Sequence, residues 1–325
     1  MFIKMLQKLK ESFLCNPSMK TLTTPYIKYS GHAGPLYTIA HADKENFIFS
    51  GGSDKTIAKW NLDVSEPENF SIKLQHTIYS ILYTKASHQL WIGQSQGGIH
   101  VVDLENKKEI KWLQSHSKGV FDLLYNSNNH TVISCSADGT LAIWDAENFS
   151  LLSLFHLTKE KVRKASLYLE NNLLAVALGN GDICLMDMTN YKEVHSFHAH
   201  NLSANVVVFH PSFPLLISGG RDAHLNIWDI QNNYKKVDSI PAHNYAIYDI
   251  AFHPSFPLFA TASRDKSIKL WNAENGTFLE KIERKTHQAH THSINKLLWV
   301  KFKDLLISTG DDSAIISWNT QIINQ

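Results

Sequence analysis

Short apolar and β-branched runs, separated by turn residues, recur along nearly the whole chain. One unit is clearest at residues 134–145, SCSADGTLAIWD, where Asp138-Gly139 separates two such runs. Asp-Gly is a tight-turn dipeptide, and the run from Leu141 to Trp144 is bulky and apolar enough for a strand buried on both faces. The pattern therefore predicts two antiparallel strands joined by a tight turn.

The position of Trp144 has an equivalent in seven places along the chain. Successive equivalents are 42, 42, 42, 42, 43 and 47 residues apart. They are Trp60, Val102, Trp144, Met186, Trp228, Trp271 and Trp318. A period in the forties, with four strand-like runs per unit and a Trp-Asp or Trp-Asn ending, is typical of a β-propeller blade. The chain resembles WD-repeat proteins, and the resemblance implies an all-β, seven-bladed β-propeller of four-stranded antiparallel blades.

We expect one domain over residues 24–325, because units that cannot bury their faces alone form one cooperative ring. Residues 26–30 precede His32 as residues 110–115 precede His116, so they fit the outermost strand of a blade. Few residues follow Trp318, whose blade lacks that strand. The N-terminal strand should therefore pair there and close the ring, which removes free sheet edges.

Residues 1–23 lie outside the repeats, and we expect them to be a flexible leader. The stretch from Ile3 to Phe13 is basic and amphipathic, which leaves open a membrane-surface or partner helix. Asn16-Pro17 interrupts this stretch, and Met19 is an alternative start. Whether residues 1–18 belong to the mature chain stays open at this point.

Five repeats carry the same four residues at constant spacing: a His, a Ser or Thr eighteen residues later, an Asp four further on, and a Trp six after the Asp. The resemblance implies that they form a structural network, in which buried indole and hydroxyl groups find hydrogen-bond partners. The sets are His32, Ser50, Asp54, Trp60; His116, Ser134, Asp138, Trp144; His200, Ser218, Asp222, Trp228; His243, Thr261, Asp265, Trp271; and His290, Ser308, Asp312, Trp318.

Repeats two and four depart from this pattern. Ile92, Gln96 and Val102 replace the Ser, Asp and Trp in repeat two, and Val176, Asn180 and Met186 replace them in repeat four. We expect the network to be absent or different there, with aliphatic packing in its place.

Repeats five and six share nearly identical segments, FHPSFPL at residues 209–215 and 252–258. Proline fixes the backbone and cannot donate to a strand ladder, so these segments should be turns between first and second strands. They should lie on the face away from the His and Asp loops, with structural roles for His210 and His253.

The sequence has no phosphate-binding GxxxxGK[ST] motif and no zinc-binding HExxH motif. A catalytic His/Ser/Asp set would occur once in a chain. These sets occur in five repeats, each with a Trp six residues after the Asp, which favours a structural role. His287, His290 and His292 have a spacing compatible with metal binding, but His290 is needed in its network. We therefore predict no catalytic residues, no metal and no cofactor.

Composition narrows the class of partner. The formal net charge of +1 provides no overall field for collecting nucleic acid, so nucleic acid is an unfavoured partner. No apolar run approaches the roughly 20 residues that span a bilayer. Three scattered cysteines predict no disulfide framework, which favours a reducing, cytoplasmic compartment.

The resemblance also places the residue five after each loop His at the channel rim, and the residue before each turn Asp on the same face. The rim residues are Tyr37, Tyr79, Phe121, Arg163, Asn205, Tyr248 and Asn295, and the residues at the turns are Ser53, Ser95, Ala137, Gly179, Arg221, Arg264 and Asp311. Aromatic residues thus fall on repeats one to three. Basic residues, with Lys159, Lys161 and Lys164, fall on repeats four to six.

Tyr and Arg are enriched at binding hot spots. We therefore predict a non-enzymatic scaffold, a monomer or part of a hetero-complex, that binds an acidic or phosphorylated protein or peptide on this face. The predicted partner-binding residues are Tyr37, Tyr79, Phe121, Arg163, Arg221, Tyr248 and Arg264. The alternatives are an enzyme or small-ligand binder at the channel mouth, a nucleic-acid-associated module, and a rim that only shields the channel.

Overall fold

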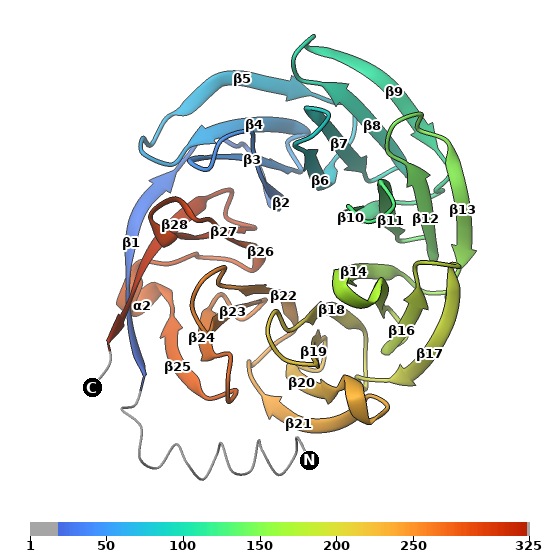
Figure 1. Cartoon of the computed structure of the whole chain (residues 1–325). Coiled ribbons are helices and arrows are strands. Elements are labelled where there is room, and N and C mark those ends of the chain that lie inside the picture. Colours follow the sequence, from blue (N-terminus) through green and yellow to red (C-terminus); the bar gives the residue numbers. More distant parts are fainter. Residues whose placement is uncertain (1–18, 324–325) are drawn as a thin grey trace.

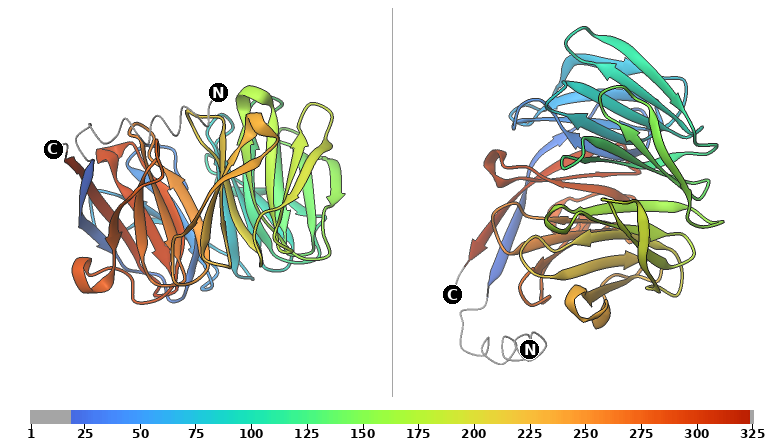
Figure 2. Two further views of the ribbon diagram at one scale, coloured as in Figure 1. Left: turned by 90° about the horizontal axis from the view of Figure 1, so that it is seen from below. Right: turned by 45° about the vertical axis from the view of Figure 1, so that its right-hand side comes forward.

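The computed structural model describes residues 19–323, and this part of the chain forms seven four-stranded antiparallel sheets around a central axis (Figure 1). Seen from the side, the ring is a disc whose strands run between its two faces (Figure 2). We number the sheets as blades in chain order from Leu36. The predicted all-β, seven-bladed propeller is confirmed.

The strands of the first four blades have the following bounds. Blade 1 contains β2 (Leu36–His41), β3 (Phe47–Gly52), β4 (Thr56–Asn61) and β5 (Pro67–Lys73). Blade 2 contains β6 (Ile78–Thr84), β7 (Gln89–Gln94), β8 (Gly98–Asp103) and β9 (Lys108–Gln114). Blade 3 contains β10 (Val120–Asn126), β11 (Thr131–Ser136), β12 (Thr140–Asp145) and β13 (Leu151–His156). Blade 4 contains β14 (Val162–Tyr168), β15 (Leu173–Leu178), β16 (Asp182–Asp187) and β17 (Lys192–His198).

The remaining blades follow the same order. Blade 5 contains β18 (Ala204–Phe209), β19 (Leu215–Gly220), β20 (His224–Asp229) and β21 (Lys235–Pro241). Blade 6 contains β22 (Ile247–Phe252), β23 (Leu258–Ser263), β24 (Ile268–Asn272) and β25 (Phe278–Ile282). Blade 7 contains β26 (Ile294–Trp299), β27 (Leu306–Gly310), β28 (Ile315–Ile323) and, from the N-terminus, β1 (Lys20–Tyr29). Helix α2 (Arg284–His287) and short 3₁₀ helices at Leu169–Asn171, Ile230–Asn232 and Phe302–Asp304 lie in connections.

The ring is closed by β1, which pairs antiparallel with β28, so the two ends of the described chain lie side by side in Figure 1. Pro25 lies opposite Trp318, and a bulge follows it. The predicted closure is confirmed, but the strand starts earlier than expected. Residues 20–23, which we placed in the leader, belong to β1, because β28 continues to Ile323 opposite Lys20. The predictions for residues 1–18 lie outside the described residues.

The core lies between neighbouring blades rather than within one blade. Strand β11 is buried along its whole length, whereas the outer strand β13 is mostly exposed. One cluster joins Ala175 and Ile183 of blade 4 to Val207 and Trp228 of blade 5. Each sheet thus buries both faces against its neighbours, which explains the continuous apolar runs of the middle strands.

Hydrogen bonds from side chains also tie the innermost strands of successive blades. Each of these bonds joins a side chain near the channel to a backbone group of the next blade. They are Ser80 Oγ to Val120 O (2.8 Å), Ala165 N to Asp122 Oδ2 (3.1 Å), Asn205 Nδ2 to Ile247 O (3.0 Å), Leu297 N to Asp249 Oδ2 (3.0 Å) and Asn295 Nδ2 to Leu36 O (2.8 Å). The inner ring is therefore held by polar contacts as well as by packing.

The two FHPSFPL segments form turns between β18 and β19 and between β22 and β23, as predicted. His210 Nδ1 accepts from the backbone N–H groups of Ser212 and Phe213, each at 3.0 Å, and Nε2–H donates to the Ala273 carbonyl at 3.0 Å. Burial lowers the pKa of His210, consistent with a neutral ring. Both ring nitrogens are used in the turn, which gives His210 a structural role.

Within residues 19–323 no helix is long and apolar enough to cross a membrane. Over the same residues, no group of three His, Cys, Asp or Glu side chains is arranged to hold a metal ion. His287 Nε2 instead lies 3.2 Å from Glu280 Oε1.

Candidate interaction surface at the channel mouth

The loops that carry the network His and Asp residues define one face of the disc, which we call the His/Asp face. In blade 1, Trp60 Nε1 donates to Ser50 Oγ at 2.7 Å, and His32 Nε2 lies 2.7 Å from the same oxygen. Because the indole can only donate, the hydroxyl proton goes to Nε2, and Nδ1–H donates to Asp54 Oδ2 at 2.7 Å. Burial opposes ionisation of Asp54, but the hydrogen bond from His32 holds its pKa below the usual value.

The other four predicted sets are also hydrogen-bonded. In blades 5, 6 and 7 the His Nδ1 to Asp oxygen distances are 3.0, 2.9 and 2.8 Å. Blade 3 differs, because Thr140 Oγ1 stands between His116 Nδ1 (2.7 Å) and Asp138 Oδ1 (2.5 Å), while His116 and Asp138 are 3.7 Å apart. The Asp also accepts from the backbone of the His loop, as Ser117 N does to Asp138 Oδ2 at 2.7 Å. The network therefore holds in place the loops that carry the His residues, and each of these loops leads into the strand that carries a rim residue.

Blade 2 fills the Ser and Trp positions of the network with apolar side chains, as predicted. Ile92 and Val102 pack with Leu90 in a buried cluster. Blade 2 also has a polar set nearer its outer edge that was not predicted, where Gln94 contacts His100 and His100 Nδ1 lies 3.0 Å from Glu109 Oε1. These side chains could not be recognised from the repeat, because they occupy other positions in it.

Blade 4 uses the same solution. Val176 and Met186 are buried in an apolar cluster. His198 Nδ1 lies 2.8 Å from Asp182 Oδ1, which links β16 to β17 at the outside of the blade. A His–carboxylate pair is thus present, but it lies near the surface instead of inside the blade.

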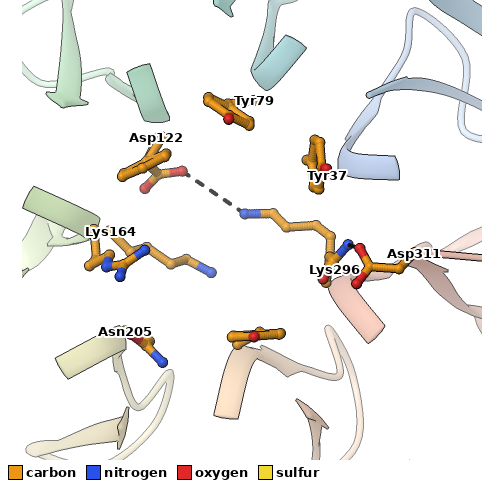
Figure 3. Close-up of a pocket in the computed structure, with 11 residues that line it drawn as sticks. Tyr37, Tyr79, Asp122, Lys164, Asn205, Lys296 and Asp311 are labelled. Atoms are coloured by element: carbon orange, nitrogen blue, oxygen red, sulfur yellow. Dashed lines mark hydrogen bonds and ion pairs between the residues drawn. The ribbon is translucent and has the colours of Figure 1, made fainter. Parts of the chain in front are cut away.

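All seven predicted rim residues line one cavity of about 380 Å³ at the mouth of the channel. The cavity is lined by Tyr37, Tyr79, Phe121, Asp122, Arg163, Lys164, Asn205, Tyr248, Asn295, Lys296 and Asp311. Figure 3 shows the labelled members of this set encircling the opening. The alignment of the seven repeats is therefore sufficient to identify the rim.

The structure separates the predicted partner-binding residues into two groups. Tyr37, Tyr79, Phe121, Arg163 and Tyr248 line the cavity, whereas Arg221 and Arg264 are not among its lining residues. Arg264 instead lies over the exposed ring of Tyr245, 5.9 Å from its centroid. The two arginines are therefore placed outside the mouth, not in the surface that we predicted as one unit.

Three aromatic rings form a continuous arc on blades 1 to 3. The ring of Tyr79 lies 5.3 Å from that of Tyr37 and 5.4 Å from that of Phe121. These separations are favourable for aromatic pairs. The Arg163 guanidinium continues the arc into blade 4, since it lies 5.4 Å from the Phe121 centroid. We call Tyr37, Tyr79 and Phe121 the aromatic arc.

Four charged side chains below the rim were not predicted as a group. Lys164 Nζ pairs with Asp249 Oδ1, and Lys296 Nζ lies 4.0 Å from Asp122 Oδ1 across the mouth (Figure 3). Burial opposes ionisation of Asp249, but Lys164 and Lys296 hold its pKa below the usual value. Burial lowers the pKa of Lys164 despite this partner. The charge of Lys164 is therefore compensated by Asp249 inside the channel. We had expected Lys164 to extend the basic surface, and it does not.

This ring of blades with its recurring His, Ser or Thr, Asp and Trp residues defines a WD-repeat β-propeller. The family model described as "WD domain, G-beta repeat" matches residues 23–61. A broader model, "Nucleolar protein 10-like, N-terminal domain", matches residues 54–319, and the chain belongs to this family.

Similar curated proteins include striatin from Homo sapiens, 23% identical over 245 residues, which cover 65% of this chain and 31% of striatin. The striatin homolog of Dictyostelium discoideum is 25% identical over 229 residues, 64% of this chain and 24% of the relative. U3 small nucleolar RNA-associated protein 21 of Saccharomyces cerevisiae is 22% identical over 191 residues, 59% of this chain and 19% of the relative. The matches thus span less than a third of each of these relatives.

Proposed function

We propose that this chain is a non-enzymatic interaction scaffold that binds a protein or peptide at the channel mouth on its His/Asp face. The observation that carries the proposal is the aromatic arc, which ends in an arginine with an unused donor. Arg163 Nε is buried and has no hydrogen-bond partner among the described residues. A ligand carboxylate or phosphate would pair with the other guanidinium nitrogens of Arg163.

The chemistry of the arc favours an apolar anchor beside an anionic group. Tyr and Phe rings provide large contact areas at a low entropic cost, and a guanidinium donates two parallel hydrogen bonds to a carboxylate or phosphate. Burial lowers the pKa of Arg163, and the nearby positive charge of Arg221 lowers it further. An anionic ligand group would relieve the repulsion between these two cations. The partner segment that we propose therefore presents an apolar side chain next to an acidic or phosphorylated one.

The test compares partners recovered from cells by the wild-type chain, by a Tyr37/Phe121/Arg163→Ala variant and by Phe256→Ala. Phe256 is 46% exposed and lies in the turn between β22 and β23, where it lines a groove formed by the two FHPSFPL turns on the opposite face. It is therefore a matched aromatic control. We expect the rim variant to lose the partners, with binding reduced roughly thirtyfold or more per hot-spot residue. Partners retained by the rim variant and lost with Phe256→Ala would place the working surface on the other face.

A second candidate is association with an RNA-containing nucleolar assembly. The observation that favours it is the family description, together with a relative named for its association with a small nucleolar RNA. Lys159 and Lys161 next to Arg163 supply basic groups for such contacts. Fluorescent tagging would test a nucleolar location against the expected cytoplasmic one. RNA affinity that falls steeply with salt would support this candidate, and salt-insensitive binding would remove it.

A further inference from the structure

The channel mouth carries an acidic group at the start of the aromatic arc as well as a basic group at its end. Asp311 precedes the network residue Asp312 in the turn between β27 and β28, and it lines the cavity. Its Oδ1 accepts from Asn295 Nδ2 at 2.7 Å. Among the described residues no cation forms an ion pair with Asp311, because both lysines of the cavity are paired with other carboxylates.

Asp311 lies next to the first ring of the arc. Burial raises the pKa of the Tyr37 phenol, and the nearby Asp311 carboxylate raises it further. Figure 3 shows Tyr37 beside Asp311, and it shows Lys164 on the far side of the opening. Arg163, the residue before Lys164 in β14, therefore stands at the other end of the arc. The order around the mouth is Asp311 on blade 7, the aromatic arc on blades 1 to 3, and Arg163 on blade 4.

The charges of the mouth are balanced rather than basic. The cavity and its floor hold three cationic side chains, Arg163, Lys164 and Lys296, and three anionic ones, Asp122, Asp249 and Asp311. Lys164 and Lys296 face Asp249 and Asp122, so these four charges largely compensate one another. Within residues 19–323, the charged side chains of the mouth that form no ion pair are Asp311 and Arg163, at opposite ends of the arc. A uniformly acidic ligand would gain at Arg163 and be repelled at Asp311.

We propose that the mouth selects a bipolar peptide segment, in which a basic side chain and an acidic or phosphorylated side chain flank an apolar one. The basic group lies beside Asp311 over the rings of Tyr37 and Tyr79, where a carboxylate and aromatic faces both attract a cation. The anionic group pairs with Arg163, and the apolar side chain packs on the arc between them. This inference rests on the proposed function and adds the cation subsite to it.

The experiment selects random phage-displayed peptides on three immobilised forms of the full chain: wild type, Asp311→Asn and Arg163→Gln. Asp311→Asn keeps the size of the side chain while removing its charge, and Arg163→Gln removes the charge and leaves a shorter polar side chain. We expect wild-type selection to enrich peptides with one basic and one acidic position. Asp311→Asn should lose only the basic preference, and Arg163→Gln should lose only the acidic one.

An enriched peptide is then synthesised with its basic residue intact or replaced by norleucine, which keeps the apolar stem. On wild type the replacement should weaken binding roughly tenfold or more, as expected for a charged hydrogen bond. On Asp311→Asn it should have little effect, and thermal melting of each variant shows that it is folded.

The outcomes separate the inference from the proposed function. Enriched peptides that are acidic but carry no basic position, or a basic preference that Asp311→Asn leaves unchanged, would overturn the bipolar site while leaving the binding surface in place. If no peptide is enriched on wild type over the Tyr37/Phe121/Arg163→Ala variant, the proposed function is wrong and this inference is wrong with it.

Discussion

Blade 3 holds its strands together with a buried chain of hydrogen bonds, whereas its neighbour blade 2 fills the same positions with aliphatic side chains. In blade 3, Trp144 donates to Ser134 Oγ at 2.9 Å, and the same oxygen bonds His116 at 2.6 Å. In blade 2, Ile92 and Val102 occupy the corresponding positions and are buried. Both blades nevertheless have the same four-stranded pairing.

The comparison shows that the buried network is one of two ways to complete a blade. A hydrogen bond adds only about 1 kcal/mol net, because folding exchanges it for bonds with water, but a buried group left unpaired costs about 1–3 kcal/mol. A blade can therefore satisfy all of these groups or contain none of them. Changes that leave a set half complete should be the damaging ones, which the following predictions test.

The largest expected effect is that of Trp144→Ala. Removing this buried indole leaves a cavity and takes one of its two hydrogen bonds from the Ser134 hydroxyl, so the free energy of unfolding should fall by roughly 3–5 kcal/mol. Val102→Ala, at the equivalent position of blade 2, removes less volume and no hydrogen bond, and it should cost about 1–2 kcal/mol. Urea denaturation of both variants gives the comparison, and equal losses would contradict it.

Ser134→Ala is a smaller change that breaks the same network. It removes the oxygen shared by His116 and Trp144, and we expect a loss of about 1–3 kcal/mol because buried donors lose their partner. The matched change in blade 2 is Ile92→Val, which also trims a buried side chain and should cost about 0.5–1.5 kcal/mol. A Ser134→Ala variant as stable as wild type would show that the network adds nothing to blade 3.

Acid should weaken the network blades in two steps. Burial lowers the pKa of His116 and His243, which stay neutral in the fold, so stability is lost as pH falls below the ordinary value of 6.5. Burial opposes ionisation of Asp312, but His290 and backbone donors lower its pKa from 3.8 to about 2. Its contribution is complete above pH 3.8 and is lost as pH falls towards about 2.

Melting temperatures measured across this pH range check the prediction. Asp312→Asn should reduce the loss between pH 3.8 and about 2. An unchanged low-pH profile for Asp312→Asn would mean that the acid sensitivity arises elsewhere.

The smallest expected effect on stability is at the mouth of the channel. Arg163→Ala and Arg264→Ala remove side chains that lie outside both the networks and the packed blade faces, and each should change stability by less than about 0.5 kcal/mol. Of the two, only Arg163 lines the cavity. A fall in melting temperature as large as that of Ser134→Ala would show that the rim serves the fold.

Much of this protein follows from its repeat. The alignment of the repeats identifies the network residues and all seven rim residues, because a repeated blade places equal positions at equal radii. The sequence does not show where β1 starts. Thr23 reads as part of a polar leader, yet its backbone N–H and its hydroxyl donate to Glu280 at 3.1 and 2.8 Å. That contact joins residues 257 apart and exists only once the ring has closed.

The sequence by itself determined the number of blades, the closing strand and the positions that face the channel, since these depend on local periodicity. Only the tertiary structure decided which charges remain unpaired. Lys164 and Asp249 are far apart in the chain and meet across the channel, as do Lys296 and Asp122. Each pairing depends on the ring diameter and on the side chain offered by another blade. The closed ring therefore leaves Arg163 and Asp311 without an ion pair among residues 19–323.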